Sequence, residues 1–351
     1  MNYPFTAPCG RTRLRLSVLA FLAVFVATAC DEADPVASSA PSDVPAVAPT
    51  EDPVAAVESP TPSLATITYA GLPYGPTSLW ASPNDVKWGP APFTGSQAAV
   101  EAGGIVTQIN TARQLKHRIM LAMTGGPSTD YTTSGKFDMA KWKKQMNTFN
   151  TSTIKNAVAA GLADGTIIGN TMIDEPETVR WGGNISKSVI DDMAAYARSI
   201  FPTLPVGINI GPPAYRWRAT ERFRKLDFVR YQYNWWITEG NVAAWRDAVL
   251  AQAKLDGVTP AFSLNILDGG IKDKNGSWDC PGTGGKGTYA PNCRMTADQV
   301  SSWGRALATA GCYLMMWRYD GTFMSKSANQ EAFRDVASAV ASRSPRSCKR
   351  P

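Results

Sequence analysis

Residues 166–177 read TIIGNTMIDEPE, and this stretch decides the fold class. The run from Thr166 to Ile173 has the apolar, β-branched composition of a strand. Pro176 then ends the strand and stiffens the turn, because proline has no backbone N–H to donate to a neighbouring strand. Two carboxylates, Asp174 and Glu175, therefore follow directly on the end of a strand.

Short apolar runs of this kind alternate with helical stretches from about Thr66 onward, which is the pattern of parallel βαβ units. The clearest strands are residues 118–123, 166–173, 205–210, 228–233, 260–266 and 312–317. Apolar periodicity predicts helices over residues 187–200, 242–255, 297–310 and 328–341. Two weaker strands, near residues 74–80 and 91–94, complete a set of eight.

Eight strands, with a helix at the end of the chain, favour an α/β fold of the closed (β/α)8 type over an open doubly wound sheet. Residues 166–173, 260–266 and 312–317 are then strands 4, 7 and 8. Active sites of such barrels lie at the carboxyl ends of the strands. The barrel domain is expected to span residues 66–351, since a barrel of this type typically needs about 250 residues.

The adjacent carboxylates Asp174 and Glu175 are the first candidates for catalysis. Burial at the end of an apolar strand and mutual repulsion both raise the pKa of a carboxyl group. Such a pair is costly unless it is solvated or used, and a functional role is therefore the favoured interpretation. The structural alternative is that one of the two caps the segment that follows.

Glu175-Pro176 resembles the Asn-Glu-Pro motif of retaining (β/α)8 glycoside hydrolases, whose acid/base glutamate ends strand 4. Asp174 replaces the asparagine that binds the sugar 2-hydroxyl in that clan. The chain also resembles a group of bacterial lipoproteins that share a Gly-Pro…Leu-Trp start, a Met-Thr-Gly-Gly turn and this Asp-Glu-Pro, and that resemblance implies no activity. The first resemblance implies that Glu175 is the acid/base of a glycoside hydrolase.

The same resemblance implies a nucleophilic carboxylate at the end of strand 7. This chain offers Asp268, in LNILDGG, and no glutamate there. A retaining enzyme needs about 5 Å between its two carboxyl groups and an inverting one roughly 6.5–9.5 Å, so Asp268 either attacks the sugar or activates water. Asp320 after strand 8 and Glu239 after strand 6 are rivals. A plain turn residue in Asp-Gly-Gly is the structural alternative for Asp268.

Aromatic and polar side chains crowd the same predicted strand ends. Sugar rings stack their C–H faces on aromatic rings, while their hydroxyls need amide, carboxylate or guanidinium partners. A single aromatic residue is more often part of a core, but eleven tryptophans with this bias favour a saccharide cleft. The expected contacts are Trp80, Asn209, Arg230, Tyr231, Tyr233, Trp235, Asn265, Trp317, Arg318 and Tyr319.

The turn MTGGP at residues 123–127 follows strand 3. It lacks the lysine and the helix start that a phosphate cradle requires. The turn either leaves room for a ligand beside its backbone or only tightens the loop.

The amino terminus indicates export. Three arginines precede an apolar run at residues 16–29 that is too short to span a bilayer. The run ends in ATAC at residues 27–30, which resembles the bacterial lipobox and predicts a signal peptide over residues 1–29 with a lipid on Cys30. Cleavage without lipidation is the alternative, because Ala27 replaces the usual leucine. Residues 30–65, rich in Pro, Ala and Ser, are predicted to be a disordered tether on the periplasmic or cell-surface side of the membrane.

Four cysteines follow the tether, and an exported protein favours disulfides. We expect Cys280–Cys293 to close a glycine-rich loop and Cys312–Cys348 to pin the carboxyl-terminal segment to the last strand. A four-thiolate zinc site is the alternative, although no C-x2-C pair is present.

His117 is the single histidine, and it precedes a strand, at the structural face of a barrel. This argues against a Ser-His-Asp triad and against a poly-histidine metal centre. The net charge of +6 falls to about +3 when the three signal-peptide arginines are removed, and no basic run is interleaved with aromatic residues. Nucleic-acid binding is therefore unsupported.

The sequence thus predicts a monomeric, lipid-anchored glycoside hydrolase that needs no cofactor. The alternative is a lipoprotein that binds saccharides on the same barrel without cleaving them. A metal-dependent hydrolase or deacetylase is disfavoured by the shortage of histidines.

Overall fold

The structure is a computed structural model that describes residues 69–79, 93–210, 221–235, 241–272, 280, 285–289 and 291–351. The chain divides into Met1–Thr61 and Pro62–Pro351, and every described residue belongs to the second unit. The predicted signal peptide, Cys30 and the tether lie outside the described residues.

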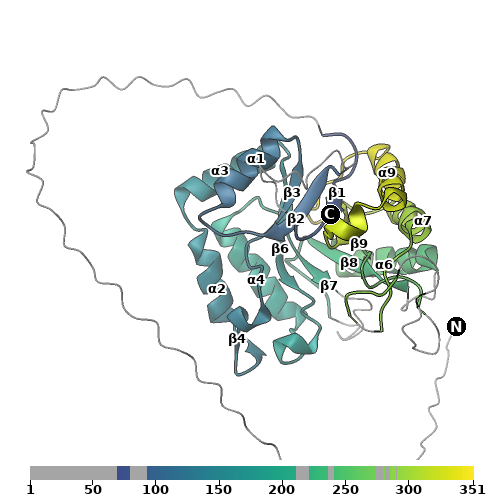
Figure 1. Ribbon diagram of the computed structural model, residues 1–351. Helices are drawn as coiled ribbons and strands as arrows, with labels where there is room; N and C mark the ends of the chain where they lie inside the picture. Colours follow the sequence, from purple (N-terminus) through teal and green to yellow (C-terminus); the bar gives the residue numbers. More distant parts are fainter. Residues whose placement is uncertain are drawn as a thin grey trace, which may run out of the picture. The chain divides into compact units, whose positions relative to one another are not determined.

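Eight parallel strands form one sheet within the described residues (Figure 1). They are β1 (Tyr74–Pro76), β2 (Gly95–Ala99), β3 (Arg118–Ala122), β6 (Ile167–Asp174), β7 (Val206–Ile210), β8 (Phe228–Tyr233), β9 (Thr259–Asn265) and β10 (Leu314–Trp317). Neighbours in the sheet follow the order of the chain, and a bridge between Thr77 and Gln97 joins the two edge strands. Across the same seam the N–H of Thr94 donates to the carbonyl of Tyr74 at 2.8 Å. The sheet closes into a (β/α)8 barrel, so the predicted fold class is confirmed.

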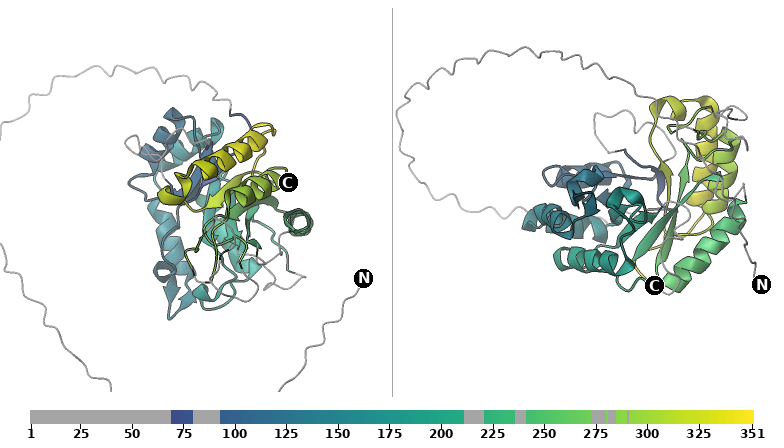
Figure 2. Two further views of the ribbon diagram at one scale, coloured as in Figure 1. Left: turned by 45° about the vertical axis from the view of Figure 1, so that its right-hand side comes forward. Right: turned by 90° about the horizontal axis from the view of Figure 1, so that it is seen from below.

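Helices alternate with the strands and cover the outside of the barrel (Figure 2). They are α1 (Ile105–Gln114), α2 (Met139–Thr148), α3 (Ser152–Ala163), α4 (Lys187–Ile200), α6 (Val242–Asp256), α7 (Ala297–Leu307), α8 (Gly321–Met324) and α9 (Ser327–Ala341). Short 3-10 helices, η2 (Ser128–Tyr131) and η3 (Val179–Trp181), and a hairpin of β4 (Thr132–Thr133) and β5 (Lys136–Phe137) lie in the loops. Several helices begin at a residue whose side chain accepts a hydrogen bond from an N–H group of the first turn. These capping residues include Asp138, Thr151, Ser186, Asn241 and Thr296.

The predicted and observed elements agree closely except at the second strand. The strand at 228–233 and the helix at 187–200 have the observed bounds. The second strand was predicted at residues 91–94, but β2 is Gly95–Ala99, so that prediction was wrong. The sequence GSQAA contains no β-branched or aromatic residue, and it forms a strand because β3 pairs with it along its whole length.

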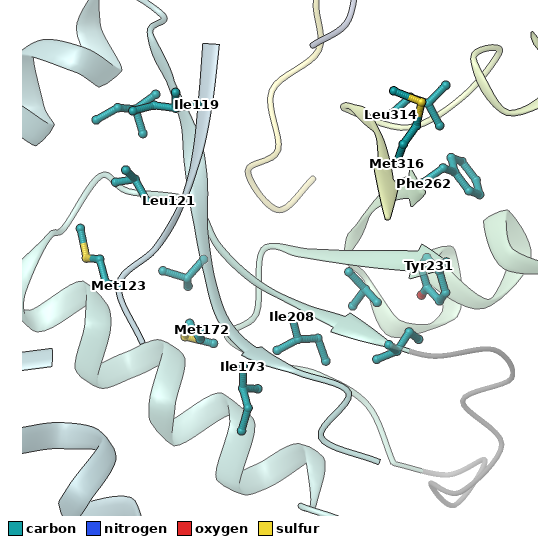
Figure 3. Packing of buried hydrophobic residues seen from close by; sticks show 14 of the residues in the cluster. Ile119, Leu121, Met123, Met172, Ile173, Ile208, Tyr231, Phe262, Leu314 and Met316 are labelled. Carbon is teal, nitrogen blue, oxygen red and sulfur yellow. The ribbon is translucent and has the colours of Figure 1, made fainter. Parts of the chain in front are cut away.

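Two clusters of buried apolar side chains fill the two sides of the sheet. The larger cluster packs between the strands and the helices and includes Ile119, Leu121 and Ile208 (Figure 3). The smaller cluster contains Met120 and Phe228 and lies inside the barrel, because side chains alternate between the two faces of a strand. Its other members are Ala261 of β9, Met315 of β10, Cys312 and Tyr313 just before β10, and Cys348 of the carboxyl-terminal segment. The end of the barrel interior where the strands begin is therefore a packed core.

Both predicted disulfides are present. The Cα atoms are 5.5 Å apart in Cys280–Cys293 and 5.3 Å apart in Cys312–Cys348. The second disulfide fixes the carboxyl-terminal segment below the barrel, where the guanidinium of Arg350 donates to the carbonyls of Leu226 and Phe223 at 3.1 and 3.0 Å. Two disulfides indicate an extracellular or periplasmic protein.

None of the helices that the structure describes has the length and apolar character of a membrane span.

His117 lies at the amino-terminal end of β3, as the sequence predicts. It is only 4% exposed, and burial lowers its pKa to about 3. A hydrogen bond with the backbone of Gly95 opposes this shift, whereas the charge of Arg118 adds to it. An imidazole held neutral inside the core is a structural histidine.

Candidate active site

Polar side chains form a row across three neighbouring strands, on the inner side of the barrel toward its carboxyl end, here called the barrel mouth. Asp174 of β6 is in register with Asn209 of β7, and Asn209 with Arg230 of β8. Nδ2 of Asn209 donates to Oδ1 of Asp174 at 3.2 Å. From across the barrel, Gln97 of β2 accepts from Nη1 of Arg230 at 2.5 Å. Three predicted site residues are thus brought together above the apolar interior.

This row has unused hydrogen-bonding capacity. Asn209 and Arg230 are at most 5% exposed, yet Oδ1 of Asn209 and Nε of Arg230 have no hydrogen-bond partner within the described ranges. A buried polar atom without a partner costs about 1–3 kcal/mol. Both atoms are enclosed by the protein, so they become available to a ligand only if the row rearranges.

Glu175 occupies a tight turn directly after β6. Its φ of 46° lies in the left-handed region, which residues other than glycine rarely adopt. Its N–H donates to the carbonyl of Asn209 at 2.8 Å, and its carbonyl accepts from the N–H and hydroxyl of Thr178 at 3.1 and 2.8 Å. The indole N–H of Trp181 also donates to the carbonyls of Asp174 and Glu175, at 3.1 and 3.0 Å. The fold therefore holds an unfavourable backbone conformation in place, a feature that is common at functional sites.

Arg180, in η3, lies against both carboxylates of the pair. Its guanidinium contacts Oδ2 of Asp174 at 3.2 Å and pairs with the carboxylate of Glu175. Burial and the charge of Asp174 raise the pKa of Glu175, while Arg180 and Arg230 lower it, and the net shift is upward. The side chains of Glu175 and Arg180 are 26% and 40% exposed, so this ion pair lies at the solvent boundary.

Asp268 follows β9 and is 2% exposed. Its Oδ1 accepts from the N–H of Tyr289 at 2.8 Å, whereas Oδ2 has no hydrogen-bond partner in the part of the chain that is described. Burial raises the pKa of Asp268, and hydrogen bonds from Tyr289 and Thr288 lower it by less. Oδ1 of Asn265 accepts from the N–H of Asp268 at 2.9 Å. Asn265 therefore positions Asp268, which in turn holds the loop that carries Tyr289.

An aromatic pair lies beside this loop. The ring of Trp317, at the end of β10, stacks on Tyr289 with centroids 6.1 Å apart, and Tyr289 is 61% exposed. The guanidinium of Arg318 lies 5.4 Å from the centre of the Trp317 ring. Tyr319 donates its N–H to the carbonyl of Thr77 at 2.9 Å.

Asp320 has a structural position. Its Oδ1 accepts from the N–H of Phe323 at 2.7 Å and caps α8. A carboxylate that satisfies a helix terminus already has a structural role. Asp268 accepts from a backbone N–H in the same way, so these contacts do not rank the two residues.

Tyr231 and Tyr233 belong to the outer side of the barrel. The ring of Tyr233 contacts Trp245 of α6 and Trp303 of α7, each at a centroid distance of 5.2 Å. Tyr231 is part of the same outer cluster (Figure 3). Because side chains alternate along β8, Arg230 is the one that faces the interior. We therefore leave both tyrosines out of the proposed site.

The remaining predicted contacts are less informative. Trp235 is partly buried against the core and donates its N–H to the carbonyl of Gly269 at 3.0 Å. Trp80 and Glu239 lie outside the described residues.

The MTGGP turn after β3 borders a cavity of about 630 Å³, lined in part by Gly125, Gly126 and Lys141. A Cβ atom at Gly125 would lie 2.5 Å from Cβ of Ala99 in β2. Packing against β2 alone accounts for this glycine.

Three residues of the site, Gln97, Arg180 and Tyr289, were not predicted from the sequence. Gln97 lies in the strand that was placed wrongly, and Tyr289 reaches the mouth through the loop closed by Cys280–Cys293. A basic residue soon after a carboxylate pair was the available signal for Arg180. Among the described residues no group of three or more His, Cys, Asp or Glu side chains is arranged to hold a metal ion.

No protein-family model matches the chain, and no curated protein matches it in sequence. Solved structures with a related arrangement include a GH113 β-1,4-mannanase, at 11% identity and a TM-score of 0.49 over 78% of this chain and 99% of that one. Others are a GH10 xylanase from Thermobacillus composti (11% identity, TM-score 0.45, 77% and 96% covered) and a GH18 chitinase from Pseudoalteromonas aurantia (10% identity, TM-score 0.43, 76% and 99% covered). These structural neighbours are glycoside hydrolases, but such distant likenesses carry no argument about the activity of this chain, which has to rest on its own site.

Proposed function

We propose that the barrel domain is a glycoside hydrolase that acts on an oligo- or polysaccharide at the barrel mouth. The observation that carries this proposal is the position of Glu175, which a fixed turn holds beside Asp174 directly after β6. Burial and the charge of Asp174 raise the pKa of its carboxyl group. A raised pKa favours the protonated form of a carboxyl group, which is the form that can protonate the leaving oxygen of a glycosidic bond. Asn209 and Arg230 lie in the same row as Asp174 and add polar groups at this place.

Arg180 gives this acid a means of control. In the free protein its guanidinium opposes protonation of Glu175. The Arg180 side chain is long and 40% exposed, so a bound sugar can displace it. Burial and Asp174 then act without that opposition, and the pKa of Glu175 rises when substrate is bound.

Asp268 is the proposed second carboxylate. The N–H of Tyr289 fixes one of its oxygens and leaves Oδ2 without a described partner. Asp268 is 2% exposed, so substrate binding has to displace the loop that carries Tyr289 before this oxygen can attack the anomeric carbon or activate a water molecule. The anomeric configuration of the first product distinguishes the two, since a separation of about 5 Å gives retention and roughly 6.5–9.5 Å gives inversion.

Sugar binding is assigned to the aromatic pair and to the polar row. The exposed Tyr289 and the partly exposed Trp317 offer ring faces to a sugar, with Arg318 beside them. Asn209 and Arg230 offer hydrogen bonds to its hydroxyls. Neither step requires a cofactor.

A saccharide-binding protein without catalysis is the second candidate, and one observation favours it. Both proposed catalytic carboxylates already have partners: Glu175 pairs with Arg180, and Oδ1 of Asp268 accepts from a backbone N–H. If these contacts persist in the complex, the mouth binds sugar but does not turn it over.

A polysaccharide panel tests the two candidates. The exported chain carrying Cys30→Ser is assayed for both product release and binding, beside Glu175→Gln and a control, Glu331→Gln, on the outside of α9. Glu175→Gln should lose roughly 10²–10⁴-fold in turnover and keep its saccharide affinity. Binding without turnover in the parent chain would favour the second candidate. Full turnover by Glu175→Gln would contradict the first.

We also propose that the mature chain is anchored through a lipid on Cys30, with residues 30–65 as a tether and residues 66–351 as the monomeric barrel domain. The ATAC sequence and the two disulfides support an exported chain. No nucleic-acid partner is proposed.

A further inference from the structure

A second cavity lies at the opposite end of the barrel. It has a volume of about 600 Å³ and lies between the start of β6, the end of α3 and the carboxyl-terminal segment 345–349, called the tail below. β6 runs from Ile167, which lines this cavity, to Asp174 at the mouth. At about 3.3 Å per residue, the strand separates the two places by roughly 23 Å. The cavity is therefore independent of the proposed catalytic site.

The charges around this cavity have one sign. Arg118, Arg346 and Lys349 line it, and none of the described lining residues is acidic. The nearest elements do carry carboxylates, but these are already paired. Asp164 contacts Arg113 at 2.5 Å, and Asp227 contacts Arg198 at 2.7 Å.

Arg118 is the most informative of the three cations because it is 4% exposed. Its guanidinium donates to the carbonyls of Gly71 at 2.9 Å and Ala70 at 3.2 Å, and it lies 5.4 Å from the centre of the Tyr69 ring. Its Nε has no hydrogen-bond partner in the described part of the chain. Two neutral carbonyls and an aromatic ring offset the cost of burying the positive charge of Arg118 less completely than a bound anion would.

The walls of the cavity set the size and character of an occupant. Leu162, Ile167 and Pro205 supply apolar surface beside the cations. The volume of about 600 Å³ is many times the roughly 30 Å³ that a water molecule takes up in the liquid. The chemistry therefore fits an anionic group attached to a larger body.

We propose that this cavity binds a phosphate group, with Arg118 at its base and Arg346 and Lys349 contributed by the tail. The disulfide Cys312–Cys348 holds the tail in place and so completes the site. The phosphate comes either from a free phosphorylated molecule or from the headgroup of an anionic lipid. Either source presents the same charged oxygens to the three cations.

The site is tested by isothermal titration calorimetry, in which the Cys30→Ser chain is titrated with inorganic phosphate. Arg346→Ala/Lys349→Ala removes two exposed cations from the tail. Lys326→Ala/Arg334→Ala removes the same charge from the region of α9, away from the cavity. The tail variant should bind phosphate at least about tenfold more weakly than the parent chain, and the control variant should bind it equally well.

Sedimentation with vesicles separates the two sources. A lipid headgroup would be identified if the parent chain binds phosphatidylglycerol vesicles but not phosphatidylcholine vesicles, and if inorganic phosphate competes with that binding. Phosphate binding without vesicle binding would identify a free phosphorylated molecule. In both cases, weaker binding by the tail variant but not by the control variant supports the site. No binding of either probe by the parent chain, or equal weakening in the tail and control variants, would overturn the proposal.

Discussion

Protonation of His117 should limit the stability of the barrel in acid. Burial lowers its pKa to about 3, whereas histidine in an unfolded chain titrates near 6.5. Above pH 7 the imidazole is neutral in both states and contributes no pH dependence. Between pH 6.5 and about 3 the unfolded chain binds a proton that the folded barrel excludes, so the free energy of unfolding falls as the pH falls. At about 1.4 kcal/mol per pH unit, the loss reaches about 3 kcal/mol at pH 4.

The variant His117→Gln removes the titrating group and isolates this contribution. Urea unfolding, followed by circular dichroism at pH 7 and pH 4, gives the free energy of unfolding of both chains. The parent chain should lose about 3 kcal/mol more than the variant between the two pH values. Carboxylates are common to both chains, so their contribution cancels in this comparison. An equal loss in the two chains would refute the assignment of a buried, neutral His117.

Three further predictions concern other parts of the chain. Lys187 and Asp256 form a buried ion pair at 2.7 Å, so Lys187→Met would leave a buried carboxylate without its cation. This should lower the free energy of unfolding, measured in urea at pH 7, by about 3–5 kcal/mol. A change within error of zero would contradict this. Arg180 lowers the pKa of Glu175 in the free protein, so Arg180→Ala should raise that pKa and move the alkaline limb of the kcat/KM profile to higher pH. An unmoved kcat/KM limb would show that the ion pair does not control the acid. Mass spectrometry of the native protein should find a diacylated Cys30 at the amino terminus, and an unlipidated start at another residue would end the proposal of an anchor.

The sequence predicted most of the fold because its strands carry strong local signals. The stretch TIIGNTMIDEPE marks both a strand and its end, and β6 is observed at Ile167–Asp174. β2 was misplaced because its small and polar residues have no strand preference of their own. Its position depends on pairing with β3, which a local pattern does not encode.

The site was predicted in part, for a similar reason. Strand ends correctly suggested that Asp174, Asn209 and Arg230 lie near one another, because neighbouring parallel strands end on the same side of a barrel. The assignment of Tyr231 and Tyr233 to the mouth ignored the alternation of side chains along β8, which turns both toward the helices.

Contacts between distant loops had no such signal. The position of Tyr289 beside Trp317 depends on the disulfide loop and on the hydrogen bond to Asp268. These contacts form only in the folded chain, so no local sequence pattern reports them.

Glu175 is proposed to donate a proton to the leaving oxygen. A substrate whose leaving group departs without being protonated does not need this acid. It therefore distinguishes a proton donor at Glu175 from a residue that only maintains the structure of the site. The kcat/KM of the parent chain and of Glu175→Gln is measured on two substrates. One is a saccharide that the parent chain cleaves, and the other is an aryl glycoside of the same sugar whose leaving group is a strongly acidic phenol. If Glu175 is the proton donor, Glu175→Gln should lose roughly 10²–10⁴-fold in kcat/KM on the saccharide and less than about tenfold on the aryl glycoside. An equal loss on both substrates, or no loss on the saccharide, would contradict it.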